Sequence, residues 1–187
     1  MAASDPALAA AGVIRPARLE ERSNIERLIA RSVRELCKGD YSSAQLEAAL
    51  GSAFGVDTSL IEDGTYFVIE EAGELIAAGG WSFRKTLFGA DARPDRTPEL
   101  LDPARDAARI RAFFVAPEQA RRGLGRRLLA RCEAEAQARG FLGVELAATL
   151  TGERLYRAMG YLPVRRFAHP LGAGLTIDFV NMQKRLG

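Results

Sequence analysis

Two glycines and four arginines surround the start of an apolar helical pattern in ARRGLGRRLL, residues 120–129. This spacing places Gly123 and Gly125 at a helix N-terminus, where backbone N–H groups are unpaired and the helix dipole is positive. Glycine has no Cβ, so a ligand can approach the backbone closely there. The pattern predicts a phosphate-binding turn, with solvated arginines around a plain glycine turn as the alternative. The arginines are Arg121, Arg122, Arg126 and Arg127.

Two common phosphate-binding motifs fit this turn poorly. A Walker loop requires Lys and then Ser or Thr after its second glycine, whereas Arg126 and Arg127 follow Gly125. A dinucleotide fingerprint requires a third glycine where Leu128 stands, although Glu145 has the spacing of about 20 residues expected of its acidic partner. The turn therefore points to another phosphate-bearing ligand.

Composition narrows the class of protein. The chain has 187 residues, of which 48% are apolar, and this suits one domain with a core. Its 26 Lys and Arg against 24 Asp and Glu give a net charge of +2, which offers no whole-chain argument for a nucleic-acid partner. Nucleic-acid binding through the arginines is therefore the least favoured interpretation. No apolar run approaches the ~20 residues of a membrane span, so we expect no membrane partner.

Cysteine and histidine are scarce. Cys37 and Cys132 lie far apart in the sequence, so we expect no disulfide framework and a reducing, cytoplasmic compartment. His169 is the single histidine and no ligand-like spacing occurs, so we expect no metal site. Residues 1–12 are small and Ala-rich without a basic region, which predicts a disordered lead-in and no secretory signal.

The apolar periodicity predicts one mixed α/β (α+β) domain over residues 13–187. Strand 109–115, helix 122–139 and strand 141–148 form a βαβ unit, so these two strands should be parallel in a mostly antiparallel sheet. Residues 84–108 carry three prolines and many charges, which predicts an inserted loop or partly helical lid. The other expected strands are 13–18, 65–70, 74–83, 161–169 and 175–186, with a hairpin turn at Ala72 and Gly73. The other expected helices are 19–37, 43–50 and 151–160, the last capped by Thr151.

Three stretches and the order of the elements resemble the GNAT family of acyl-CoA N-acetyltransferases. FFVAPEQARRGLGRRLL, residues 113–129, resembles the family's pyrophosphate-binding strand, turn and helix, and GVELAA, residues 143–148, its parallel strand. LYRAMGY, residues 155–161, resembles the family's Leu-Tyr-x-x-x-Gly-Phe/Tyr segment. The resemblance implies a GNAT-like mixed sheet with helices on both faces, acetyl-CoA as cosubstrate, and a homodimer as a common assembly.

The resemblance also implies direct transfer of an acetyl group from acetyl-CoA to a primary amine, of a small molecule or a protein, in a ternary complex. Tyr156 would protonate the leaving thiolate, because a Tyr pKa of about 10 lies above a thiol's ~8.5. A strand N–H near Val115 would stabilise the oxyanion, and the pantetheine arm would add to the edge of strand 113–115. The residues expected to bind CoA are Phe113, Phe114, Val115, Arg121, Arg122, Gly123, Leu124, Gly125, Arg126 and Thr149.

The chain departs from the family where a general base is expected. Arg109 stands early in the fourth strand, where many members have an acidic residue, and Ala120 replaces a usual Gln or Arg. Glu145, on the neighbouring strand, is the best-placed acid for taking the ammonium proton. Water relayed to solvent is an equal rival, and His169 a lesser one. Because the base is not matched, a non-catalytic acyl-CoA-binding sensor module is the alternative function, and it predicts CoA binding without thiol release.

The sequence also offers candidates for the acceptor site. Trp81 and Phe83, with residues 84–108, could wall this site, or the two aromatic residues could be ordinary sheet residues. Acidic residues of the insert could attract a cationic amine, although no single one is singled out. These residues are Asp91, Asp95 and Glu99.

Overall fold

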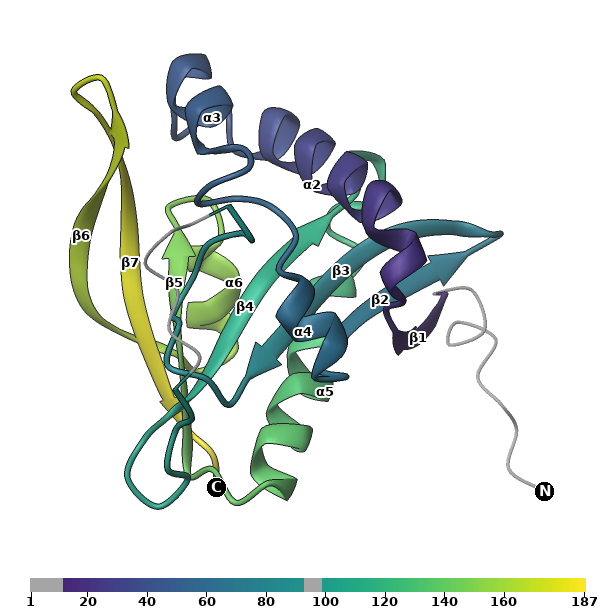
Figure 1. The fold of residues 1–187 in the computed structure, drawn as a ribbon, viewed down its shortest axis with the longest axis vertical. Helices are drawn as coiled ribbons and strands as arrows, with labels where there is room; N and C mark the ends of the chain where they lie inside the picture. Colours follow the sequence, from purple (N-terminus) through teal and green to yellow (C-terminus); the bar gives the residue numbers. More distant parts are fainter. Residues whose placement is uncertain (1–11, 93–98) are drawn as a thin grey trace.

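A single mixed sheet of seven strands runs through the protein (Figure 1). The structure is a computed structural model that describes residues 12–92 and 99–187. The strand order is β1-β2-β3-β4-β5-β7-β6, in which β4 and β5 are parallel and the other neighbours antiparallel. The predicted mixed fold with its parallel βαβ unit is confirmed. The strands are β1 (Val13–Pro16), β2 (Tyr66–Glu71), β3 (Glu74–Ser82), β4 (Ala108–Val115), β5 (Gly143–Thr149), β6 (Leu162–Gly172) and β7 (Leu175–Arg185).

Helices cover both faces of the sheet, and each buries one apolar stripe. One core lies under α2, α3 and α4 and includes Val68 and Phe179, whereas the other lies under α5 and includes Phe67 and Leu146. The buried stripe of α5 consists of Leu124, Leu128, Leu129, Cys132 and Ala136. The helices are α2 (Arg22–Leu36), α3 (Ser43–Ala49), α4 (Thr58–Glu62), α5 (Leu124–Ala138) and α6 (Glu153–Ala158), with 3-10 turns η1 (Leu19–Glu21) and η2 (Pro117–Gln119).

Three local features differ from the sequence prediction. A five-residue helix, α4, follows its cap Asp57, and it is too short for a helical periodicity to show. The N-cap of α6 is Gly152 rather than Thr151, whose hydroxyl instead donates to an aspartate after α2. The β6–β7 hairpin is longer than predicted because β6 continues to Gly172, and the turn to β7 is made at Ala173 and Gly174.

β4 and β5 separate soon after they begin. Their parallel pairing is limited to Ala108 with Val144 and Arg109 with Glu145. β5 itself stays paired with β7 as far as Thr149. On its β5 side the remaining length of β4 therefore borders an opening in the sheet, whereas its other edge stays paired with β3.

A bulge bends β4 at the point where this opening begins. Ala112 has φ +55°, a left-handed conformation that costs energy for a residue with a side chain. The Tyr66 hydroxyl donates to the Ala112 carbonyl at 3.0 Å and so holds the bulge from β2. Opposite it on β3, a Cβ on Gly79 would come within 2.9 Å of the Phe113 ring. The glycine is needed there because the bulged strand leaves no room for a side chain.

Two expectations fall on residues that the structure does not describe, namely Asp95 and all of the predicted lead-in over residues 1–12 except Gly12. Within residues 12–92 and 99–187, no helix has both the length and the hydropathy needed to cross a membrane.

Candidate active site

The glycine turn lies beside a cavity of about 610 Å³, which we call the donor cavity. Arg121 and Gly123 have φ +69° and +79°, so the chain turns sharply before α5 begins. The amides that open α5 have no partner within the helix and border this cavity. A Cβ on Gly125 would lie 3.0 Å from a methyl carbon of Leu155, so this glycine allows α5 to approach α6. The cavity is lined by Leu36, Val115, Gln119, Ala120, Arg121, Gly123, Leu124, Gly125, Arg126, Thr151, Arg154, Leu155 and Ala158.

Two arginines of this turn line the donor cavity, and a third is paired with a carboxylate outside it. Arg121 and Arg126 line the donor cavity and are exposed. Arg122 is instead held by the carboxylate of Glu71, 3.0 Å away, and the pair lowers the pKa of that carboxyl. Arg154, on α6, adds a cation to the cavity that the sequence prediction missed, because it lies outside the glycine motif.

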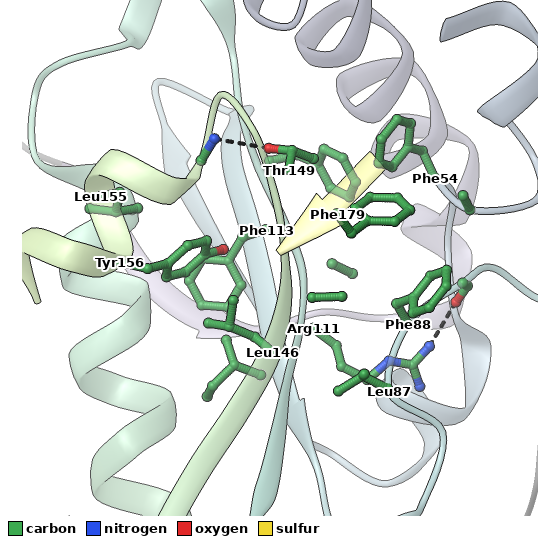
Figure 2. A pocket seen from close by; sticks show the side chains of 18 of the residues that line it. Phe54, Leu87, Phe88, Arg111, Phe113, Leu146, Thr149, Leu155, Tyr156 and Phe179 are labelled. Carbon is green, nitrogen blue, oxygen red and sulfur yellow. Dashed lines mark hydrogen bonds between the residues drawn. The ribbon is translucent and has the colours of Figure 1, made fainter. Parts of the chain in front are cut away.

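A second cavity of about 150 Å³ lies where β4 and β5 separate, and we call it the transfer cavity (Figure 2). It shares Val115, Gly125 and Leu155 with the donor cavity, so the two lie against one another. Its wall continues past β4 to Phe54 and Phe88, from segments far apart in the sequence. The remaining lining residues are Ala53, Gly55, Leu87, Gly89, Ile110, Arg111, Ala112, Phe113, Phe114, Leu146, Ala147, Thr149, Gly152, Tyr156 and Phe179.

Tyr156 and Thr149 are the predicted site residues on the α6 side of this cavity. The Tyr156 side chain is only 8% exposed, and burial raises the pKa of its hydroxyl above the usual range. Its ring meets Phe113 edge-on with centroids 6.5 Å apart, and no hydrogen bond to its hydroxyl occurs among the described residues. Thr149 accepts a hydrogen bond from the Gly152 N–H at 2.9 Å, which fixes the start of α6 (Figure 2). Thr149 therefore helps to set where Tyr156 lies.

β4 contributes the three residues that were expected to contact the acyl donor. Phe113, Phe114 and Val115 all line the transfer cavity. The Val115 N–H, the expected oxyanion donor, donates to the hydroxyl of Ser32 on α2 at 3.3 Å. Ser32 is 5% exposed, and no local sequence pattern indicates that it meets β4.

The structure does not bring Glu145 together with Tyr156. Glu145 lies at the paired end of β4 and β5, where its carboxylate forms an ion pair with Arg109 and accepts from the Gln183 amide at 2.9 Å. Among the described residues, those that line the transfer cavity include no carboxylate. His169 lies on β6, edge-on to Phe88, and is not part of the cavity wall either.

A buried ion pair that the sequence did not predict closes the far end of the cavity. The Arg111 guanidinium lies 2.5 Å from an Asp57 carboxylate oxygen, and the two side chains are 2% and 0% exposed. Arg111 also donates to the Gly89 carbonyl at 2.7 Å (Figure 2). The pair thus ties β4, the start of α4 and the insert together.

For Trp81 and Phe83 the structure favours the alternative, that both are ordinary core residues beside the sheet. Trp81 is 1% exposed and packs under α5, where its indole N–H donates to Glu135, so it does not line the transfer cavity. Phe83 packs against the same core. The insert takes part instead through its residues 87–89. The two aromatic residues lie on the α5 face because side chains alternate along a strand. The alternation in the sequence separates the two faces of the strand but does not tell which helix covers each face.

The acidic residues of the insert that the structure describes already have partners. Asp91 accepts from the Thr58 N–H at 2.9 Å, and Glu99 forms an ion pair with Lys85. Tyr161 packs in the core, at 1% exposed, with its hydroxyl 2.9 Å from Glu133. Within residues 12–92 and 99–187, no cluster of His, Cys, Asp and Glu could hold a metal ion.

Comparison with known proteins identifies the class to which this fold and site belong. Residues 30–161 match the Acetyltransferase (GNAT) family, so the match spans well over half of the chain. The chain belongs to the GNAT acetyltransferase family. No curated protein sequence matches it significantly.

Solved structures of N-acetyltransferases share the fold over nearly the whole chain. A GCN5-related N-acetyltransferase from Rhodopseudomonas palustris is 21% identical, with a TM-score of 0.71 over 94% of this chain and 96% of its own. PaiA N-acetyltransferase from Thermoplasma acidophilum, in complex with coenzyme A, is 14% identical, with a TM-score of 0.63 over 93% and 98%. YncA from Salmonella typhimurium, a putative acetyltransferase with its cofactor acetyl-CoA, is 19% identical, with a TM-score of 0.63 over 94% of each chain.

Proposed function

We propose that the protein transfers the acetyl group of acetyl-CoA to a primary amine by direct attack in a ternary complex. The observation that carries this proposal is the transfer cavity, which opens between β4 and β5, adjoins the donor cavity and presents Tyr156. Coenzyme A or acetyl-CoA accompanies two of the similar structures, which supports the same ligand here.

The donor cavity suits the polyanionic end of coenzyme A. Backbone N–H groups at the start of α5 would bind the pyrophosphate, since they are unpaired and lie at the positive end of the helix dipole. Arg121, Arg126 and Arg154 line the same cavity and would neutralise phosphate charge. The pantetheine arm would follow the open edge of β4 towards Val115 by main-chain hydrogen bonds.

Transfer would then take place at Tyr156. The amine nitrogen attacks the thioester carbon, a C–N bond forms, the C–S bond breaks, and the thiolate takes the Tyr156 proton. Burial raises the pKa of this hydroxyl, so Tyr156 keeps its proton at neutral pH and can act as the acid. A β4 N–H near Val115 would stabilise the oxyanion, with the Ser32 hydroxyl as its partner before the substrate binds.

The proton of the attacking ammonium would leave through water. Glu145 is held by Arg109, and the described part of the cavity wall holds no carboxylate, so water relayed to solvent is the favoured route. A second proton, lost by the nitrogen once it has bonded to the carbonyl carbon, would return through the same water to the Tyr156 oxygen, which replaces the proton taken by the thiolate. Glu145 remains the alternative base, acting through an intervening water.

Calorimetric titration with acetyl-CoA and a thiol-release assay over a panel of primary amines test the proposal. We expect binding in the micromolar to millimolar range and thiol release that depends on the amine. No binding at about millimolar acetyl-CoA would overturn the proposal. Binding without thiol release for any amine would identify the sensor module instead.

A further inference from the structure

We propose that the acceptor is a monoamine carrying an aromatic group, and that this group lies against Phe54, Phe88 and Phe179. This inference rests on the proposed function, because it concerns the acceptor end of the same transfer cavity. In Figure 2, Leu155 and Tyr156 lie on one side of the cavity, and Phe54, Phe88, Phe179 and Arg111 lie on the other. The donor cavity adjoins the first group, so the acceptor must come to the second.

Aromatic rings dominate the acceptor side of the cavity. Phe179 on β7 meets Phe54 with ring centroids 5.9 Å apart and planes at 86°, and it meets Phe88 at 5.1 Å. Phe114 on β4 meets Phe54 at 6.3 Å and 83°. We call these four residues the aromatic wall. Such edge-to-face and tilted arrangements are those in which a further ring is also bound favourably.

The size and burial of this wall fit one ring. Phe54 and Phe179 are 5% and 2% exposed, and Phe88, on the insert, is only partly buried at the rim. The transfer cavity has a volume of about 150 Å³. A cavity of roughly this volume accommodates a group the size of benzene, so its acceptor end, which is only part of it, has room for no more than one ring. Phe88 is therefore the ring that an incoming acceptor would meet first.

The charge of the wall excludes a second cation on the acceptor. Arg111 is the one charged side chain among the described residues that line the transfer cavity, and Asp57 neutralises it at 2.5 Å. A second ammonium group would lose its hydration without gaining a carboxylate, which is costly. The acceptor should therefore carry its positive charge only on the nitrogen that is acetylated.

Two matched pairs of acceptors test ring and charge separately. The first pair is 2-phenylethylamine and ethylamine, and the ring should raise kcat/KM about 100-fold, because it removes roughly 120 Å² of apolar surface from water. The second pair is n-hexylamine and 1,6-diaminohexane, of which the diamine should be at least about tenfold worse. Equal kcat/KM values within either pair would overturn the inference.

Two variants test whether the wall itself is responsible. Phe88→Ala should lower the ratio of kcat/KM for 2-phenylethylamine over ethylamine by about tenfold. Phe167→Ala is the matched control, since this ring also packs on Phe88 and Phe179 but does not line the cavity, and it should keep the ratio within about threefold. An equal fall of the ratio in both variants would assign the effect to packing and contradict the inference.

A binding measurement separates this inference from the proposed function. N-(2-phenylethyl)acetamide, the product, should bind by calorimetry to protein saturated with coenzyme A, whereas N-ethylacetamide should not bind measurably at the same concentration. The proposed function fails if no amine releases thiol, and the aromatic site still stands if the product binds. The inference fails if the product does not bind at about 10 mM, even when small aliphatic amines are acetylated.

Discussion

Replacing Tyr156 by Phe removes one oxygen atom from the transfer cavity and leaves the ring in place. Because no hydrogen bond to this hydroxyl occurs among the described residues, the free energy of unfolding should change by less than about 0.5 kcal/mol. The ring contacts with Phe113 and Tyr161 should persist, and so should the shape of the cavity beside the donor site. A change in kcat would then report on the proton that the Tyr156 hydroxyl gives to the leaving thiolate.

The expected loss in kcat is about 100-fold at pH 7, the lower end of what a positioned general acid contributes. Without Tyr156 the thiol must leave as a thiolate inside a cavity of only about 150 Å³, where a charge is poorly solvated. A free thiol has a pKa of ~8.5, so the difference between the two proteins should shrink as the pH rises beyond that value.

Thiol release measures kcat, and calorimetry with acetyl-CoA measures binding, which should stay within about twofold. Tyr161→Phe is the matched control, because its hydroxyl lies 2.9 Å from Glu133 and outside the cavity. Losing this hydrogen bond to a charged group should cost about 1.5–3 kcal/mol and lower Tm by roughly 4–8 °C, with kcat unchanged. A kcat for Tyr156→Phe within threefold of the parent protein, or a collapse of acetyl-CoA binding, would refute the assignment.

Three further predictions concern the proton, the buried ion pair and the glycine turn. With 2-phenylethylamine, kcat/KM should rise about tenfold per pH unit from pH 7 to 9, because only the neutral amine attacks. It should not fall again in this range, because burial raises the pKa of Tyr156 and keeps its proton in place. A plateau of kcat/KM that disappears in Glu145→Gln would instead make Glu145 the base. Asp57→Asn leaves the Arg111 cation buried beside a neutral amide and should lower the free energy of unfolding by about 3–5 kcal/mol, as measured by chemical denaturation. The double variant with Arg111→Met should recover most of this stability. A double variant whose loss equals the sum of the two single losses would contradict this prediction. Gly125→Ala places a Cβ 3.0 Å from a leucine methyl of α6 and should raise the Kd of acetyl-CoA at least about tenfold, as measured by calorimetry. An unchanged Kd would show that this turn does not bind acetyl-CoA.

Local patterns in the sequence were enough to place the donor side of the site. The turn at Gly123, the bulk of α5 and the helix that carries Tyr156 all depend on residues within a few positions of one another, and the structure has them where the patterns predicted. The tight turn at Ala72 and Gly73 between β2 and β3 is also as predicted, because turn residues act through their own dihedral angles. Such features can be predicted without knowing the tertiary contacts of the chain.

Only the tertiary structure decided the acceptor side. The aromatic wall joins Phe114 of β4 and Phe179 of β7 with Phe54 and Phe88 from two connecting segments, and no local spacing relates them. Likewise, the separation of β4 from β5 depends on a bulge held by another strand. These features arise from contacts between residues distant in the chain, whose partners are fixed by how the two cores pack. The sequence by itself therefore determined the family and the glycine turn at the start of α5, and packing determined the shape and the lining of the opening in the sheet.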